Sequence, residues 1–313
     1  MEYRRLGNSG LKVSVVGLGT NNFGGRTEEA ASRQVIDAAL DAGINLFDTA
    51  DVYSRRISEE IIGRGIKGRR DAVVLATKFR SPMGEGPNEQ GGSRRYIHRA
   101  VEASLCRLQT DYIDLYQMHS PDPETPIEET LGALNDLVRA GKVRYIGSSN
   151  FHGWQIADAA WVAREHHWSP FISAQNHYSL VERGVEAEVI PACARFGVGM
   201  LPYFPLASGL LTGKYRRGEA APPGTRLSTS PRAGRFLSDA RFDVVERLER
   251  FAAERGTTIL QVAIGGLAAQ PQVASVIAGA TKPEQVRANV EAGSWKPTPE
   301  DLAELDRLSP TPR

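Results

Sequence analysis

The feature that most constrains this chain is a repeated unit. A short apolar segment ends in polar residues or glycine, and a helical pattern of about 10–17 residues follows. The apolar segments that we predict to be strands are residues 13–17, 44–47, 72–77, 112–117, 143–147, 171–174, 197–201 and 273–277. Strands that alternate with helices are typical of α/β proteins with a parallel sheet.

Two architectures suit such a repeat, a closed (β/α)8 TIM barrel and an open doubly wound sheet. A dinucleotide-binding sheet of the second kind has G-x-G-x-x-G after its first strand, but here Gly17-Leu18-Gly19 is followed by Asn22. The number of strands and the length of 313 residues therefore favour the barrel. We expect one domain over residues 1–313, an N-terminal β-hairpin that turns at Asn8-Ser9-Gly10, and extra helices near the C-terminus.

Local signals predict where some helices begin and end. Thr125 precedes Pro126 and stands three residues before Glu128, and Thr281 stands three residues before Glu284. Both spacings predict capping boxes. Gly141 is expected to end a helix. The stretch 204–238 is rich in Gly, Pro and Ser and is too long for an ordinary connection, which is typical of a lid or binding loop.

Composition excludes several classes of protein. The formal net charge is +1, so nothing favours binding to nucleic acid or to an acidic membrane surface. No stretch approaches the roughly 20 apolar residues of a membrane helix. The N-terminus has no apolar signal region, and Cys106 and Cys193 lack metal-ligand spacing, so we expect a cytoplasmic protein with reduced thiols and no metal site.

In such a barrel the C-terminal ends of the strands meet at one face, and function concentrates there. Asp48 and Tyr53 follow the second predicted strand, Lys78 the third and His119 the fourth. We interpret Asp51 as a loop-capping carboxylate. Polar and aromatic residues also follow the later strands, namely Ser148, Ser149, Asn150, Gln175, Asn176 and Tyr203.

Asp48, Tyr53, Lys78 and His119 form one coherent chemical set. A phenol is a poor acid at neutral pH, with a pKa of about 10, and a nearby ammonium lowers that pKa. The ammonium needs a carboxylate partner if it is buried. A histidine could hydrogen-bond the substrate oxygen. Such a set suits protonation of a carbonyl oxygen while a hydride arrives at the carbon.

Over nearly its full length the chain resembles the aldo-keto reductases. The motifs are "GLGT", "DTADVY", "ATKF", "TDYIDLYQMHSPDP", "TPIEETLGALNDLVRAGKVRYIGSSNF", "QNHYSL" and "GATKPEQVRANV". The resemblance implies a metal-free, NAD(P)H-dependent barrel that reduces a small aldehyde or ketone to an alcohol. It also implies that Tyr53 donates the proton, that Lys78 and Asp48 tune it, and that His119 orients the carbonyl or assists proton transfer.

The same resemblance implies a cofactor site. Ser149, Asn150 and Gln175 would surround the nicotinamide carboxamide and Tyr203 would stack on the ring. Phe204, Leu206 and Ser208 would meet the pyrophosphate, and residues 279–289 would hold the adenosine end. The full set of implied cofactor-binding residues is Gly19, Thr20, Asn21, Ser149, Asn150, Gln175, Tyr203, Phe204, Pro205, Leu206, Ser208, Gly209, Lys214, Gly279, Thr281, Lys282, Gln285 and Asn289.

Two segments depart from the family pattern. Many relatives read Tyr-Gly-x-Gly-x-Ser-Glu where this chain has Tyr53-Ser54-Arg55-Arg56-Ile57-Ser58-Glu59. Many NADPH-specific relatives have arginine at the position of Gln285, although Lys282 partly restores the positive charge. The expected cofactor is NADPH, with NADH possible.

Three function classes compete. The first is a carbonyl reductase. The second is a cofactor-binding regulatory module with slow turnover, like the beta subunits of voltage-gated potassium channels, which share the fold. The third is a Schiff-base aldolase with Lys78 as the nucleophile. The cofactor-site residues disfavour the third class, whereas the sequence leaves the carbonyl substrate and the oligomeric state open.

Overall fold

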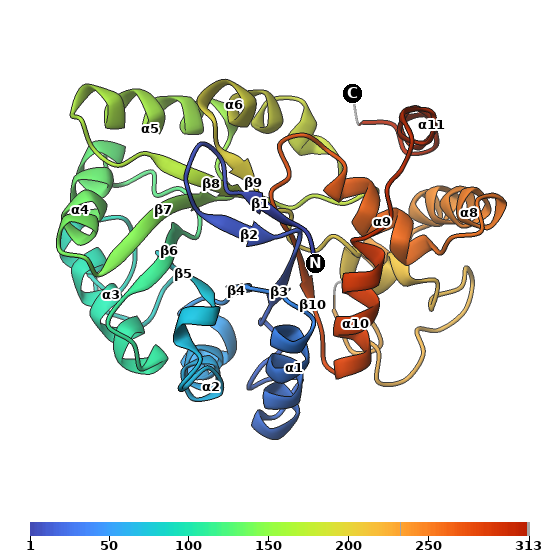
Figure 1. The fold of residues 1–313 in the computed structure, drawn as a ribbon, viewed down its shortest axis with the longest axis horizontal. Coiled ribbons are helices and arrows are strands. Elements are labelled where there is room, and N and C mark those ends of the chain that lie inside the picture. Colours follow the sequence, from blue (N-terminus) through green and yellow to red (C-terminus); the bar gives the residue numbers. More distant parts are fainter. Residues whose placement is uncertain (232, 312–313) are drawn as a thin grey trace.

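The computed structural model describes residues 1–231 and 233–311. Eight parallel strands form one sheet in the order β10-β3-β4-β5-β6-β7-β8-β9, and helices surround it (Figure 1). Isolated bridges join Met200 to Val273 and Tyr203 to Ile277, so β9 and β10 close the ring. The predicted (β/α)8 barrel is therefore confirmed. The strands are β3 (Val16–Gly19), β4 (Leu46–Asp48), β5 (Val74–Phe79), β6 (Ile113–Met118), β7 (Val143–Ser149), β8 (Phe171–Gln175), β9 (Gly199–Met200) and β10 (Val276–Gly279).

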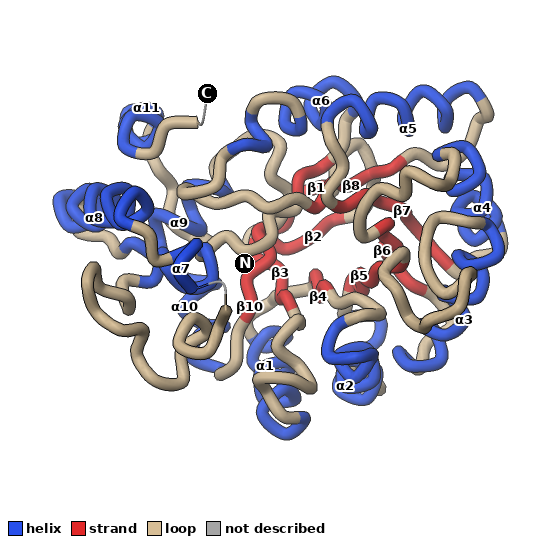
Figure 2. Tube along the Cα trace, turned by 180° about the vertical axis from the view of Figure 1, so that it is seen from behind, coloured by secondary structure: helices blue, strands red, loops and turns tan. Residues whose placement is uncertain are grey.

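The tube drawn from behind shows the helices outside the strands (Figure 2). They are α1 (Glu29–Asp41), α2 (Ile57–Gly65), α3 (Arg94–Leu108), α4 (Ile127–Arg139), α5 (Gly153–Glu165), α6 (Val189–Phe196), α7 (Ala233–Phe236), α8 (Asp239–Glu254), α9 (Ile259–Ala268), α10 (Pro283–Ala292) and α11 (Pro299–Leu308). The expected extra helices near the C-terminus are present, because α11 follows the helix of the last strand–helix unit.

The N-terminal hairpin pairs β1 (Tyr3–Arg5) with β2 (Lys12–Ser14) in antiparallel register. The backbone N–H of Asn8 donates to the carbonyl of Gly197 at 2.7 Å. The Arg4 guanidinium donates to the carbonyl of Val273 at 3.2 Å. Both acceptors precede barrel strands, so the hairpin covers the N-terminal end of the barrel, opposite the end where the strands deliver their polar residues.

Several strands begin and end later than predicted. The segment 13–17 spans the junction of β2 and β3, and 273–277 only overlaps the start of β10. Apolar residues such as Val73 are buried before the ladder begins. At the other end the ladder continues into polar residues, since Lys78 pairs with Gln117 and Ser149 with Gln175. Along one segment, the buried apolar residues therefore begin before the paired strand does, and the paired strand ends after them.

The two predicted capping boxes are wrong. The Thr125 hydroxyl donates to Asp122 at 2.8 Å, and Pro126 is the N-cap of α4. At α10 the N-cap is Lys282, and the Gln285 side chain, rather than Glu284, accepts from the Thr281 N–H at 2.8 Å. Gly141, with φ of +73°, follows α4 as predicted, because glycine adopts left-handed backbone without strain.

Alternation along the strands sets the level at which the barrel interior becomes polar. Side chains two residues apart point to the same side of a strand. The apolar interior cluster includes Leu46, Ala76 and Leu115, together with Leu6 and Val13 of the hairpin segment. Two positions further along the same barrel strands stand Asp48, Lys78 and Gln117, all buried. The core therefore ends in a polar layer at the C-terminal face.

Candidate active site

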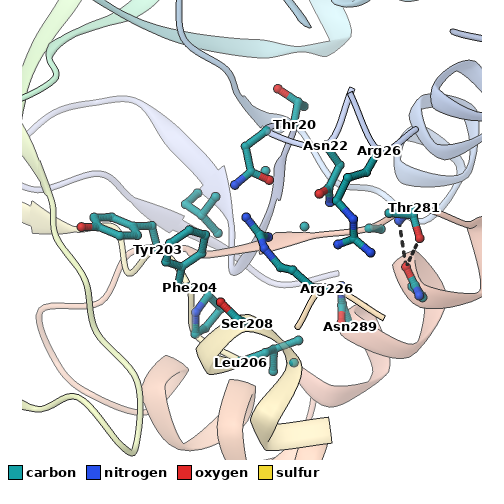
Figure 3. A pocket seen from close by; sticks show the side chains of 18 of the residues that line it. Thr20, Asn22, Arg26, Tyr203, Phe204, Leu206, Ser208, Arg226, Thr281 and Asn289 are labelled. Atoms are coloured by element: carbon teal, nitrogen blue, oxygen red, sulfur yellow. Dashed lines mark hydrogen bonds between the residues drawn. The ribbon is translucent and has the colours of Figure 1, made fainter. Parts of the chain in front are cut away.

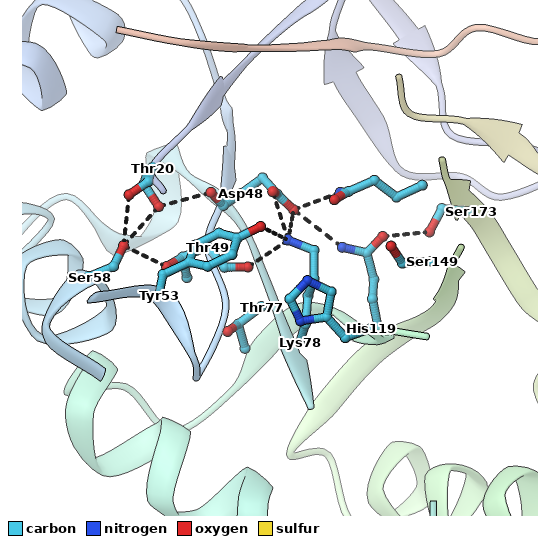
Figure 4. Close-up of polar contacts among 12 residues, drawn as sticks. Thr20, Asp48, Thr49, Tyr53, Ser58, Thr77, Lys78, His119, Ser149 and Ser173 are labelled. Carbon is cyan, nitrogen blue, oxygen red and sulfur yellow. Dashed lines mark hydrogen bonds and ion pairs between the residues drawn. The ribbon is translucent and has the colours of Figure 1, made fainter. Parts of the chain in front are cut away.

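Asp48 and Lys78 form a buried ion pair at the C-terminal ends of β4 and β5 (Figure 4). The Lys78 ammonium donates to both Asp48 carboxylate oxygens at 2.8 Å and to the Thr49 carbonyl at 2.8 Å. Burial opposes the charge on Lys78, but Asp48 and Tyr53 together raise its pKa. Lys78 is therefore charged at neutral pH, and its hydrogen bonds fix the position of the ammonium.

Tyr53 lies beside this pair. The Lys78 ammonium donates to the Tyr53 hydroxyl at 3.4 Å, and the Tyr53 ring meets His119 edge-on at a centroid distance of 5.8 Å. Burial raises the pKa of the Tyr53 phenol by more than the Lys78 charge lowers it. The lowering effect of Lys78 that the sequence predicts is therefore present, but burial outweighs it and the pKa of Tyr53 is raised overall. At neutral pH the hydroxyl keeps its proton.

His119, after β6, is held neutral. Burial, helped by the positive charges of Lys78 and Arg80, lowers the pKa of the imidazole to about 3. Its Nδ1 atom lies 3.4 Å from the Ser81 hydroxyl oxygen. A neutral imidazole can donate one hydrogen bond but cannot act as a strong acid. Of the two roles that the resemblance implies for His119, orienting a carbonyl suits this state better.

Two glutamines hold the Asp48 carboxylate in place. The side-chain amides of Gln175 and Gln117 donate to the same Asp48 oxygen at 2.8 and 3.3 Å. Gln175 was expected beside a nicotinamide carboxamide, and the structure places it on Asp48 as well as on the cavity wall. Gln117 was missed, although it stands two residues before His119, on the inward side of β6.

The turn after Tyr53 is strained. Ser54, Arg55 and Arg56 have φ of 48°, 53° and 83°, in the left-handed region that disfavours residues with a side chain. The same region explains why many relatives have glycine at two of these three positions. The Arg56 guanidinium donates to the Met83 carbonyl at 2.6 Å and so ties the turn to the β5–α3 loop.

Asp51 does not cap a loop. It is 1% exposed, and neither carboxylate oxygen has a hydrogen-bond partner among the described residues. Burial, together with the neighbouring carboxylate of Glu59, raises the pKa of Asp51 to about 7. Glu59 is itself paired with Arg107 at 2.6 Å and accepts from the Thr77 hydroxyl at 2.6 Å.

One cavity of about 680 Å³ opens beside Tyr53 and His119 and extends to α10. Figure 3 shows the part of it between Tyr203 and Thr281. Every residue that the sequence assigned to the cofactor lines this cavity, from Gly19 on β3 to Asn289 on α10. Asp48, Tyr53 and His119 also line it, whereas Lys78 is fully buried behind Asp48 and Tyr53. The structure thus brings the two predicted sets together around one cavity.

The cavity also contains residues that sequence analysis did not single out, among them Asn22, Arg26, Thr212, Thr225, Arg226, Leu260, Ile277 and Ala288. Arg226 lies within the irregular stretch 204–238, and its guanidinium stands over the Phe204 ring at 4.8 Å. Arg26 donates to the Gly224 carbonyl at 3.3 Å. In Figure 3 both guanidiniums point into the cavity from different segments.

We call Arg26, Lys214, Arg226 and Lys282 the cationic cluster. All four line the cavity, and within residues 1–231 and 233–311 none forms an ion pair with a carboxylate. Burial and the neighbouring charge of Arg26 lower the pKa of Arg226. Unpaired cations in a concave site favour an anionic ligand, because the ligand supplies the missing negative charge.

A chain of hydrogen bonds connects Tyr203, in the cavity wall, to the backbone of His119. The Tyr203 hydroxyl donates to the Asn150 side-chain oxygen at 2.7 Å. The Asn150 amide nitrogen donates to the His119 carbonyl at 2.9 Å and to the Ser149 hydroxyl at 3.1 Å. The Tyr203 ring is therefore held at a fixed position relative to His119.

The described residues contain no group of three or more His, Cys, Asp or Glu side chains placed to hold a metal ion. Within the same residues no helix combines the length and the apolar character needed to cross a membrane.

Comparison with known proteins gives a consistent result. A model of the aldo/keto reductase family matches residues 15–310. The chain is 40% identical to the uncharacterized oxidoreductase YrpG of Bacillus subtilis (strain 168), covering 100% of this chain and 97% of that protein. It is 38% identical to a probable voltage-gated potassium channel subunit beta of Oryza sativa subsp. japonica (98% and 96% covered). It is 36% identical to the versiconal hemiacetal acetate reductase of Aspergillus parasiticus (98% and 96% covered).

Proposed function

The chain belongs to the aldo/keto reductase family, and from this premise we propose that it reduces an aldehyde or ketone to an alcohol, with NADPH as the reductant. One observation supports the proposal above all. A fully buried ammonium, fixed by Asp48, lies 3.4 Å from the Tyr53 hydroxyl at the wall of the cavity. This arrangement suits a phenol that must give up its proton during the reaction and recover it afterwards.

When bound, the reduced nicotinamide supplies the hydride that the carbonyl carbon accepts. The chain's own residues orient and protonate the carbonyl oxygen. Tyr53 donates its hydroxyl proton to the developing alkoxide, and the Lys78 ammonium stabilises the phenolate that remains. Asp48 keeps Lys78 charged and in place. His119, being neutral, donates a hydrogen bond that orients the carbonyl oxygen. Each role uses the charge state that burial and the neighbouring groups impose.

The cavity suits a dinucleotide with a 2′-phosphate. The ring of Tyr203, fixed by Asn150, offers a flat surface for the nicotinamide. The cationic cluster would bind the phosphates. Because NADPH carries a phosphate that NADH lacks, four unpaired cations favour NADPH, and Lys282 at the start of α10 is the residue that we assign to the 2′-phosphate.

The test is a panel of small aldehydes and ketones, neutral and anionic, assayed with NADPH and with NADH by the loss of absorbance of the reduced cofactor. We expect turnover of at least one carbonyl, faster at limiting NADPH than at limiting NADH. A protein that binds neither cofactor would refute the proposal.

A second candidate function is supported by the relatives named as potassium channel subunits, which match the chain over almost its whole length. On this hypothesis the chain binds the cofactor and acts through a partner protein. Tight NADPH binding without reduction of any carbonyl in the panel would favour it. A Schiff-base aldolase is disfavoured, because Lys78 is held as an ammonium by Asp48 and lacks the free amine that such a nucleophile needs.

We further propose that the protein works in the cytoplasm on a small carbonyl compound. The two cysteines, Cys106 and Cys193, are free, as expected for thiols in a reducing compartment.

A further inference from the structure

His119 can serve a carbonyl oxygen only if the correct ring nitrogen bears the proton. A neutral imidazole has one N–H and one lone pair, and the hydrogen bond at one nitrogen determines which form is present. The charge state of His119 is settled by its burial and by Lys78 and Arg80. What remains is the choice between a proton on Nδ1 and a proton on Nε2.

Ser81 is the side chain that bears on this choice. Its hydroxyl oxygen lies 3.4 Å from His119 Nδ1, and the described part of the chain shows no other hydrogen bond to the imidazole ring. The backbone of Ser81 is anchored, because its carbonyl accepts from the hydroxyl of the buried Tyr96 at 3.0 Å. The adjacent Arg80 carbonyl accepts from the Gly91 N–H at 3.0 Å. The hydroxyl is therefore presented to Nδ1 by a fixed segment.

The hydroxyl allows two arrangements, since serine can donate or accept. If Ser81 accepts, Nδ1 bears the proton and Nε2 offers a lone pair to the cavity. A carbonyl oxygen also has only lone pairs, so this arrangement repels it. If Ser81 donates, Nδ1 is the acceptor and Nε2–H is a donor, which matches both the carbonyl and the alkoxide that forms from it.

We propose that Ser81 is a positioning residue, which donates its hydroxyl hydrogen to His119 Nδ1 and thereby keeps the proton on Nε2 for the substrate oxygen. The inference rests on the proposed carbonyl reduction for its purpose, but the tautomer itself is a property of the free protein. No proton is consumed in this arrangement, because the Ser81 hydrogen stays on its oxygen throughout and Tyr53 supplies the proton that is transferred.

The first experiment reads the tautomer without turnover. The full-length protein is labelled with ¹⁵N-histidine, and long-range ¹H–¹⁵N NMR spectra are recorded at neutral pH. His119→Gln identifies the His119 signals among those of the 6 histidines. We expect a protonated Nε2 and an unprotonated, hydrogen-bonded Nδ1 in the wild type, a mixture of tautomers in Ser81→Ala, and the wild-type pattern in Ser81→Thr, which keeps the hydroxyl.

A protonated Nδ1 in the wild type would overturn the proposal, and so would identical His119 signals in the wild type and Ser81→Ala. If Ser81→Ala does not fold, Ser81→Cys replaces it, because a thiol is a weaker donor of similar size and should give an intermediate mixture. An unchanged tautomer in Ser81→Cys would again overturn it.

The second experiment measures kcat on a carbonyl that the panel identifies. Ser81→Ala should lower kcat about three- to tenfold, which corresponds to the loss of one ordinary hydrogen bond. The affinity for NADPH should be unchanged. Ser81→Thr, which keeps the hydroxyl, should restore kcat. An unaltered kcat would overturn the mechanistic role. If the wild type reduces nothing, the proposed function fails while the NMR result still decides the tautomer, so the two failures are distinguishable.

Discussion

At the end of the cavity beside Tyr53 and His119, which we call the catalytic end after its proposed role, Lys78 is held by Asp48, and Asp48 is held in turn by Gln175. In the cationic cluster, by contrast, four positive side chains have no carboxylate partner in the described residues. Asp48 and Lys78 stand at the ends of β4 and β5, His119 follows β6 directly, and Tyr53 lies in the short 3-10 turn after β4. Arg26, Lys214 and Arg226 lie in connecting segments further from the strand ends.

The difference shows which charges the chain neutralises with its own side chains and which it leaves for a bound anion to neutralise. A buried charge without a partner is costly, so the catalytic end must be complete before anything binds. Positive charges around an open cavity remain partly solvated, so they are tolerated without a partner. An anion that binds among them gains binding free energy from these charges. Substitutions at the catalytic end should therefore alter rate and folding, and substitutions in the cationic cluster should alter affinity.

Tyr53→Phe is the change with the largest expected effect and the most direct test of this division. It removes the hydroxyl that Lys78 contacts and keeps the ring that packs against His119. Reduction should fall by about 10²–10⁴-fold or more, since general acid catalysis is typically worth this much. NADPH titration followed by protein fluorescence should change little. A near wild-type rate on a good substrate would show that another group donates the proton.

Asp48→Asn should show that the catalytic end depends on its internal pairing for stability. The substitution leaves the Lys78 ammonium, which is 0% exposed, without a charged partner. Breaking a buried pair in this way costs about 3–5 kcal/mol, to be measured as the free energy of unfolding in urea. The matched control is Asp243→Asn, which breaks an exposed pair with Arg217 and should cost far less, because water screens exposed charges. Equal losses in the two variants would contradict the argument.

The catalytic end was also the part that the sequence could predict. Strand-end residues are recognisable because a buried apolar run stops at an acid, a lysine or a histidine, and the barrel brings such ends together. The net shift of the Tyr53 pKa was not predictable, because it depends on how much protein covers the hydroxyl. Gln117 was missed because an inward polar residue inside a strand looks like any other member of the strand.

The cationic cluster shows the opposite case. Lys214 and Lys282 were assigned to the cofactor by resemblance, but Arg26 and Arg226 were not. Arg226 lies in the stretch 204–238, where no periodicity indicates which side chains turn inward. The predictions of helix caps were wrong for a related reason. Thr125 has the spacing of a capping box, yet its hydroxyl binds Asp122, a competitor that only the folded loop brings near.

Asp51 is the exception at the catalytic end, a buried carboxyl that the chain does not pair. Its folded pKa of about 7 exceeds the unfolded value. As the pH rises from about 4 to about 7, the unfolded chain has lost the proton and the folded chain still holds it, so stability falls over this window. Above it the loss is complete, about 4 kcal/mol.

Asp51→Asn should remove this slope and be more stable than the wild type at pH 8, as measured by urea unfolding at several pH values. Glu188→Gln, which alters an exposed carboxylate beside His152, is the matched control and should keep the slope. If Asp51→Asn unfolds with the same pH dependence as the wild type, the Asp51 carboxyl is ionised in the fold and an unseen partner compensates it.

Lys282→Ala, the smallest expected effect, tests whether the cationic cluster distinguishes between phosphates. Lys282 is exposed, lines the cavity and is the N-cap of α10, where the free backbone amides also favour an anion. One exposed charged contact should be worth about tenfold in affinity for NADPH, and NADH, which lacks the 2′-phosphate, should bind as before. The measurement is the Kd of each cofactor at constant ionic strength, with Lys67→Ala as an exposed control outside the cavity.

If both affinities fall together, Lys282 attracts the pyrophosphate or the whole dinucleotide, and discrimination must come from Arg26 or Arg226. A loss confined to NADPH, with kcat unchanged at saturating cofactor, would show that the cationic cluster acts on affinity alone.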